Sequence, residues 1–247
     1  ELFLPNELKH FQIATGLPSK SLVKGRFTLK GDNYDQLIDS PFELAEQSRF
    51  SFEANGIPHE FVISGQHNTN LERLKTDIEQ ICQTEINMFG SAPFQNYTFM
   101  TMATGNSYGG LEHCNSTSLI TPRDDLPKAD EAEEPSKDYQ RFLGLCSHEY
   151  FHSWLVKFIR PENFANYDLQ KEGYTSLLWI FEGFTSYYDD LILLRSGVIS
   201  QTSYLELLKA QIDRYLQNPG RAIQSVSESS FDAWIKFYRQ DENSNNA

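Results

Sequence analysis

The sequence predicts a mixed α and β fold, because segments of two kinds follow one another along its 247 residues. Residues 1–66 lack helical periodicity and contain short runs rich in β-branched and aromatic residues, which are typical of strands. In most of the remaining chain, apolar residues recur three and four positions apart, as they do in amphipathic helices. One further β-branched and aromatic run, at residues 97–103, interrupts these helical segments.

The N-terminal segment is predicted to be the end of a β-rich domain. Two strand-like runs, at residues 49–53 and 60–64, flank Asn55-Gly56, a dipeptide that favours a hairpin turn. A domain boundary is expected at residues 65–68. Residues 1–66 are therefore assigned to the C-terminal part of an N-terminal β domain, and residues 67–247 to a second domain.

Helices are predicted in the second domain over residues 69–90, 138–158, 175–195 and 202–217. The first begins at a capping box formed by Thr69 and Glu72, and the third ends at Gly197. The fourth is expected to face inward with its apolar residues Leu205, Leu208, Ile212 and Tyr215.

The helix at residues 138–158 contains His148-Glu149-Tyr150-Phe151-His152, which is the pattern H-E-x-x-H. Four residues make about 1.1 helical turns, so His148 and His152 point the same way and can bind one metal ion. Glu149 can reach a water bound there and act as a general base. The helix is expected to hold both histidines in its middle. The alternative interpretation is two core histidines satisfied by hydrogen bonds.

A catalytic zinc site usually has a third protein ligand, and Glu182 is the best candidate. It lies among apolar neighbours such as Phe181 and Phe184, where a buried carboxylate needs a partner. A surface acid on an amphipathic helix is the alternative. Further along the same helix, Asp189 and Asp190 either accept a hydrogen bond from a ligating histidine or are solvated acids.

The run Glu-Gly-Phe-Thr-Ser-Tyr-Tyr at residues 182–188 resembles the gluzincin metallopeptidases, whose third ligand is a Glu on the next helix. The gap of 29 residues between His152 and Glu182 resembles the glycyl aminopeptidase family. The segments 147–154, 228–236 and 33–41 (Asn-Tyr-Asp-Gln-Leu-Ile-Asp-Ser-Pro) strengthen this likeness, which extends across most of the chain. The resemblance implies an α+β fold with a thermolysin-like zinc peptidase domain, which in the family precedes a PDZ-like domain.

The segment Tyr108-Gly109-Gly110-Leu111-Glu112-His113 follows the predicted strand at residues 97–103. Gly109 and Gly110 allow another backbone to approach closely, so a substrate peptide can pair along this edge. Glu112 is placed to bind a free α-amino group by a charged hydrogen bond. The segment resembles the exopeptidase motif of aminopeptidase N relatives, which implies that Glu112 anchors the substrate amino terminus. A β-bulge with an exposed acid is the alternative.

These residues together predict a zinc-dependent aminopeptidase, in which zinc activates a water and Glu149 takes its proton. The family name implies that Gly or Ala is released. A zinc endopeptidase and a catalytically incompetent peptide-binding protein are the alternatives. The resemblance places the tyrosine that stabilises the oxyanion slightly beyond Tyr238, in a segment that the chain ends too early to include. No oxyanion donor is therefore assigned, and the chain is expected to be one stretch of a longer protein.

A net charge of −13 argues against nucleic acid and anionic membranes as partners and leaves peptides with a free amino terminus as the expected one. The chain has no run of 18 apolar residues. Three widely spaced cysteines predict neither a disulfide framework nor a C-x-x-C metal site, and they favour a reducing compartment such as the cytoplasm. An upstream signal peptide, and so a periplasmic or secreted protein, stays open. The oligomeric state is not predicted.

Overall fold

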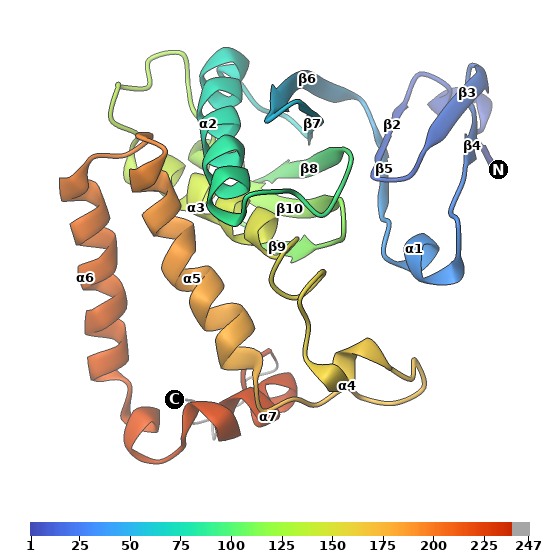
Figure 1. Ribbon diagram of the computed structural model, residues 1–247. Helices are drawn as coiled ribbons and strands as arrows, with labels where there is room; N and C mark the ends of the chain where they lie inside the picture. The colour runs from blue at the N-terminus through green and yellow to red at the C-terminus, as the bar shows by residue number, and fades with distance from the viewer. Residues whose placement is uncertain (239–247) are drawn as a thin grey trace.

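A five-stranded mixed sheet lies at the centre of the computed structural model, which describes residues 1–238 (Figure 1). The strands, in the order β6-β7-β8-β10-β9, are β6 (Gln47–Ala54), β7 (Ile57–Ser64), β8 (Tyr97–Thr104), β10 (Ser116–Pro122) and β9 (Gly109–Glu112). In Figure 1, long helices lie on one side of this sheet and a group of N-terminal strands lies on the other. The predicted α+β fold class is confirmed.

The pairing of the strands leaves β9 at an edge of the sheet. Strands β6 and β7 form the predicted antiparallel hairpin, and its turn residues Asn55 and Gly56 have φ angles of 50° and 74°, as a type I′ turn requires. Strand β8 runs parallel to both β7 and β10, and β9 pairs with β10 in the antiparallel sense. One side of the β9 backbone therefore has no neighbouring strand within residues 1–238.

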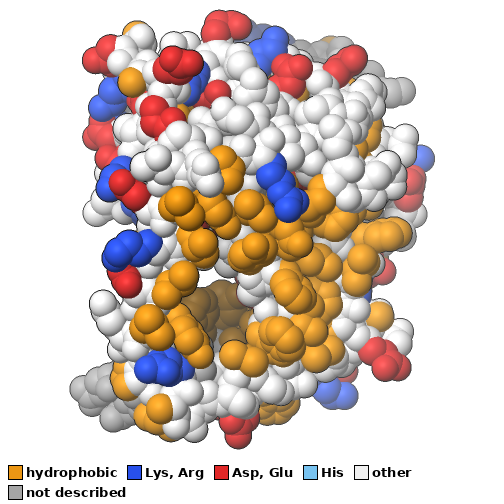
Figure 2. Space-filling view, turned by 60° about the vertical axis from the view of Figure 1, so that its left-hand side comes forward, with side chains coloured by type: hydrophobic (Ala, Val, Ile, Leu, Met, Phe, Trp, Pro, Cys, Tyr) orange, Lys and Arg blue, Asp and Glu red, His pale blue; other side chains and the backbone are white. Residues whose placement is uncertain are grey.

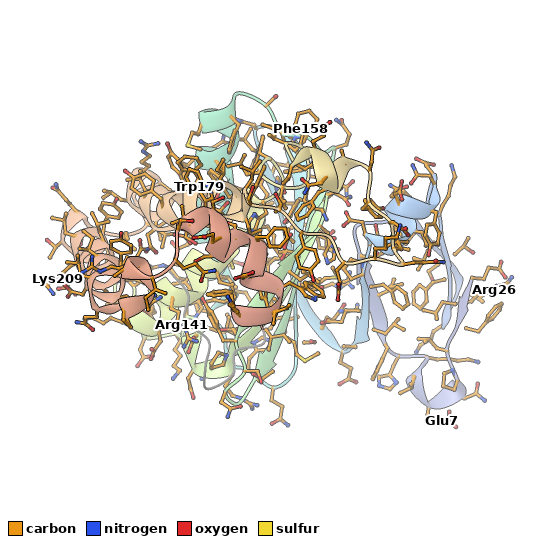
Figure 3. All side chains as sticks on the ribbon, turned by 90° about the horizontal axis from the view of Figure 1, so that it is seen from below. Glu7, Arg26, Arg141, Phe158, Trp179 and Lys209 are labelled. Atoms are coloured by element: carbon orange, nitrogen blue, oxygen red, sulfur yellow. The ribbon has the colours of Figure 1, made fainter. Side chains whose placement is uncertain are left out.

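Residues 1–45 form smaller structures beside the central sheet. One small sheet contains β1 (Leu2–Phe3), β4 (Arg26–Leu29) and β3 (Ser19–Val23), and another pairs β2 (Gln12–Thr15) with β5 (Phe42–Ala45). The short helix η1 (Asn6–Leu8) precedes β2, and α1 (Tyr34–Ile38) joins β4 to β5. In Figure 3, Glu7 and Arg26 of this part lie at the opposite end of the molecule from Lys209.

The central sheet draws its strands from both sides of the expected boundary at residues 65–68. Strands β6 and β7 come before that boundary and the other three come after it. The division into residues 1–66 and 67–247 stays a prediction.

The helices of the C-terminal part are α2 (Leu71–Phe89), η2 (Arg123–Asp125), α3 (Lys137–Phe151), α4 (Glu162–Ala165), α5 (Leu178–Arg195), α6 (Gln201–Gln217), η3 (Pro219–Ala222) and α7 (Val226–Lys236). Helix α2 begins after Asn70, whose side chain accepts the Arg73 N–H, so the predicted cap is one residue too early. It ends at Gly90 in the left-handed conformation. Within residues 1–238, no helix combines the length and the apolar character needed to span a bilayer.

Helix α3 is shorter than its predicted range of residues 138–158, because it ends at Phe151 and His152 is its C-terminal cap. The chain turns immediately afterwards: the Lys157 N–H donates to the His152 carbonyl oxygen at 3.0 Å, and Val156 has a φ of 115°. A helix cannot pass through that conformation. The expectation that both histidines lie in the middle of a helix is therefore wrong for His152. Its φ of −60° remains helical, which preserves the i, i+4 relation to His148.

Aromatic packing between the sheet and α3 fixes the position of that helix. The ring of Tyr150 lies 4.7 Å from that of Tyr97 and 5.7 Å from that of Phe99, and all three side chains are fully buried. Cys146, on the same helix, is also buried and has a free thiol. One face of α3 is thus held in the core, and the residues at its C-terminal end are presented beside β9.

Helix α6 packs against the rest of the molecule through one flank only. Leu205, Ile212 and Tyr215 are 52%, 49% and 56% exposed, so the prediction that they face inward is wrong, whereas Leu208 packs against the core. The reason is that the spacing of apolar residues gives the apolar side of a helix but not the element that covers it. Figure 2 shows apolar side chains gathered around a hollow on this face of the molecule.

Candidate metal centre

The three predicted metal ligands lie together where the end of α3 meets the first turns of α5. The Nε2 atoms of His148 and His152 are 3.1 Å apart. The Oε2 atom of Glu182 lies 3.4 Å from the first and 3.6 Å from the second. Among the described residues these three side chains form one of two clusters that can offer three ligand atoms within 4.8 Å of one another.

The spacing of these atoms fits a zinc ion. Ligand atoms about 2.0–2.1 Å from a tetrahedral metal lie roughly 3.4 Å from each other. Separations of 3.1, 3.4 and 3.6 Å are close to that value for all three pairs. Two imidazoles and one carboxylate also form a donor set that is common at catalytic zinc sites, which keep a fourth position open.

Both histidines are oriented by a second hydrogen bond from the ring nitrogen that faces away from the cluster. His148 Nδ1 lies 3.0 Å from Asp189 Oδ2, and His152 Nδ1 lies 2.8 Å from the Leu155 carbonyl oxygen. If each Nδ1 carries the proton and donates it, each Nε2 keeps its lone pair for a metal. Asp189 is thus in contact with one of the two candidate ligand histidines. Leu155 was missed, and no sequence pattern identifies it, because it acts through its backbone.

Asp190, the other acid considered for this position, points elsewhere. Its Oδ2 atom accepts a hydrogen bond from Gln211 Nε2 on α6, at 2.7 Å. The helical spacing explains the difference, since consecutive residues on α5 face directions about 100° apart.

The cluster holds more acidic than basic groups, and this imbalance favours a bound cation. Burial lowers the pKa of His148, but hydrogen bonds to Asp189 and Glu182 outweigh it and raise that pKa to about 10. Burial also raises the pKa of Glu149 to about 7, although both histidines act to lower it. A divalent cation at the three ligand atoms would neutralise these acids without a proton on either histidine.

Strand β9 passes directly over Glu149. A Cβ atom added at Gly110 would overlap the Glu149 carboxylate and lie 2.5 Å from its Cδ atom, whereas one at Gly109 would meet nothing. The glycine pair was predicted to allow the approach of another backbone, and the close approach found at Gly110 is to the Glu149 side chain. Further along the strand, Glu112 offers an oxygen within 4.8 Å of ligand atoms of Glu149 and His152.

Tyr238, the last described residue, lies within electrostatic reach of the same acids. Burial and the negative charges of Glu182, Glu112 and Glu149 raise its pKa, so its phenol keeps a proton at neutral pH. The oxyanion donor that the family resemblance places after this residue lies outside the described residues.

A buried acid behind the cluster, Glu85 on α2, was missed in the sequence. The Ser147 hydroxyl lies 2.9 Å from Glu85 Oε1 and 3.1 Å from the Asp189 carbonyl oxygen. One hydroxyl has one hydrogen, so if it donates to the carbonyl, Glu85 must be the donor to Ser147. Burial raises the Glu85 pKa well above its usual range, which agrees with a protonated side chain. The available signal was an acid between Cys82 and Ile86 on the apolar face of α2.

A Glu85→Gln variant is expected to be more stable than the wild type at neutral and alkaline pH. Below the unfolded-state pKa of about 4.3, both folded and unfolded wild-type chains are protonated at residue 85. Above it, only the unfolded chain releases the proton, so the wild-type free energy of unfolding falls by up to about 1.4 kcal/mol per pH unit from this group. Gln has no such proton. Urea unfolding of both proteins at several pH values measures the difference, with Glu72→Gln on the same helix as control. A difference that does not grow with pH would show that Glu85 is ionised.

The chain is similar to known peptidases in sequence and in structure. Residues 141–247 match the profile of a family described as M61 glycyl aminopeptidase, and this range includes His148, His152 and Glu182. The chain is also similar to the crystal structure of an aminopeptidase N family protein from Idiomarina loihiensis, with 47% sequence identity and a TM-score of 0.93. That similarity covers 98% of this chain and 41% of the other, so the chain spans about two fifths of the length of that relative. No curated protein matches it. The C-terminal part of the chain thus matches the glycyl aminopeptidase family, and nearly the whole chain is similar to a protein of the aminopeptidase N family.

Proposed function

We propose that this chain holds the catalytic centre of a zinc-dependent aminopeptidase. One observation supports this most strongly. Three ligand atoms lie together at the spacing of a zinc site, Glu149 lies beside them, and the edge strand β9 passes over Glu149. The match of residues 141–247 to a family described as M61 glycyl aminopeptidase supports the reaction class.

In this proposal His148, His152 and Glu182 hold the zinc ion. When bound, the ion supplies a Lewis acid that polarises the peptide carbonyl and lowers the pKa of a water molecule. Asp189 and the Leu155 carbonyl keep the two imidazole rings in the orientation that binding requires.

Glu149 acts as the general base and then as the general acid. Its side chain is buried next to His148, His152 and Glu182 but is not a member of that cluster. The raised pKa, about 7, suits a group that takes a proton from water and passes it to the leaving amine.

Strand β9 and Glu112 bind the substrate in this proposal. A peptide that pairs with the free edge of β9 lies across the zinc ligands, because Gly110 adjoins Glu149. The Glu112 carboxylate then accepts hydrogen bonds from the substrate ammonium group, which fixes the cleaved bond at one residue from the amino terminus. The preference for Gly or Ala rests on the family description alone.

A zinc endopeptidase is the second candidate, favoured by the open edge of β9, which can also bind the middle of a chain. The two candidates differ in their requirement for a free amino terminus. An aminopeptidase cleaves an alanyl peptide and fails to cleave its N-acetylated form, whereas an endopeptidase cleaves both.

A Glu112→Gln variant is expected to lower kcat/KM for peptides with a free amino terminus by about ten- to a hundredfold, which is the value of one charge-assisted hydrogen bond. Its zinc content should not change. Assays of the natural full-length protein with free and N-acetylated alanyl peptides give the comparison, and Glu53→Gln, an exposed acid on β6, serves as control. Equal cleavage of both peptides by the wild type would exclude the aminopeptidase.

A further inference from the structure

We propose that Asp39 positions Glu112 for the substrate amino terminus, by tying the chain just after Glu112 to the loop just after His152. This inference rests on the proposed function. Asp39 caps the C-terminal end of α1, far from both of these segments in sequence, and belongs to none of the residues that would touch zinc or substrate.

The Asp39 carboxylate contacts two separate parts of the centre. Its Oδ2 atom accepts the backbone N–H of Cys114 at 2.8 Å, and its Oδ1 atom accepts a hydrogen bond from Lys157 Nζ at 2.5 Å. His113 Nδ1 lies 3.4 Å from the same Oδ1 atom. One side chain thus joins the segment that follows Glu112 to a cation five residues after His152.

On the metal side, Lys157 belongs to the tight turn that holds His152. Its backbone N–H donates to the His152 carbonyl oxygen at 3.0 Å. In the same turn, the Leu155 carbonyl oxygen is the hydrogen-bond partner of His152 Nδ1. The position of Lys157 is therefore fixed relative to a zinc ligand.

On the substrate side, Asp39 is one of several groups that hold the segment after Glu112, and it is the one that connects this segment to the turn after His152. Cys114 is exposed, and its backbone N–H has Asp39 as its acceptor. His113 is buried, and its backbone N–H donates to the Ser116 carbonyl oxygen in the turn between β9 and β10. The Asp39 carboxylate consequently connects the backbone just after β9 to the turn that holds His152.

The ion pair between Asp39 and Lys157 is partly buried and charged, so it can hold the two segments that it joins in a fixed relative position. Both side chains are only 21% exposed. Burial would raise the Asp39 pKa, but hydrogen bonds to His113, Cys114 and Lys157 hold it well below its usual range, so the carboxylate stays ionised. The desolvation of both charges opposes their attraction, so the role proposed for this pair is to fix geometry and not to add stability.

A second contact between α1 and the C-terminal part provides a matched control. The Tyr167 hydroxyl donates to Asp35 Oδ1 at 2.7 Å. This bond also docks α1, but it is exposed and involves neither the segment after Glu112 nor the turn after His152. Asp35→Asn therefore weakens the docking of α1 while the contacts of Asp39 remain.

The test compares Asp39→Asn, Lys157→Met and Asp35→Asn in the natural full-length protein loaded with zinc. Binding is measured by calorimetry for alanine hydroxamate, which has a free amino group, and for its N-acetyl derivative, which lacks one. Zinc content is measured on the same samples. We expect Asp39→Asn to weaken binding of the free-amine ligand about tenfold or more, with a matching rise in KM for alanyl peptides. Binding of the acetylated ligand, kcat and zinc content should stay close to wild type.

The quantity compared is the ratio of the affinity for the free-amine ligand to the affinity for its N-acetyl derivative. Lys157→Met should lower this ratio as Asp39→Asn does, and Asp35→Asn should leave it unchanged. If Asp39→Asn does not fold, Lys157→Met decides, because Asp39 then still binds Cys114. An unchanged ratio in the folded variants, or an equal loss for both ligands, would overturn the role of Asp39. A wild-type protein that binds both hydroxamates equally would instead contradict the aminopeptidase function.

Discussion

A Glu149→Gln variant is expected to keep its zinc and to lose about 10²- to 10⁴-fold in kcat. Gln has nearly the same shape as Glu but cannot take a proton, so the variant removes the general base and little else. The loss should fall on kcat more than on KM, because Glu149 interacts with a proton that moves only during the reaction. Steady-state kinetics on an alanyl peptide, with zinc measured in the same preparation, gives both values.

Two results would contradict this role for Glu149. A variant with wild-type kcat would mean that another group takes the proton. A variant that has lost its zinc would mean that Glu149 holds the metal, as the second cluster of Glu112, Glu149 and His152 allows on distance alone.

A Gly110→Ala variant is also expected to show a large effect, a loss of about a hundredfold or more in kcat/KM. The added methyl group would overlap the Glu149 carboxylate, which is buried and has little room to move. A displacement of a catalytic group by about 1 Å can cost about 10²-fold. Zinc content should be unaffected, since the three heavy atoms nearest to the added methyl group all belong to Glu149, which is not a zinc ligand in this proposal.

Gly105→Ala provides the matched control for this substitution. Gly105 lies in the turn that leads into β9, and a Cβ atom there would meet nothing within 4 Å. The control should retain wild-type kcat/KM. If Gly110→Ala is equally active, β9 does not approach Glu149 as closely as the structure indicates.

The parts of the centre that depend on local spacing could be predicted from the sequence. His148 and His152 face one way because four residues make about one helical turn, and this relation holds although the helix ends at Phe151. Glu182 and Asp189 lie seven residues apart on one helix, so both reach His148. The hairpin at Asn55-Gly56 was likewise fixed by its turn residues.

The parts that depend on long-range contacts could not be predicted. The turn after His152 requires a positive φ at Val156, a residue that gives no signal for it. The exposed apolar residues of α6 show that an apolar side of a helix does not reveal which element, if any, packs against it. Asp39 meets Lys157 across 118 positions, a pairing that arises from the docking of α1 and that no local pattern encodes.

The binding of one zinc ion by His148, His152 and Glu182 is tested most directly by elemental analysis of the purified protein beside a His152→Ala variant. About one zinc per chain is expected in the wild type. Little or none is expected in the variant, which retains two of the three ligands. A wild-type protein that takes up no zinc from an excess of the metal, or a variant that keeps a full equivalent, would contradict the proposed centre.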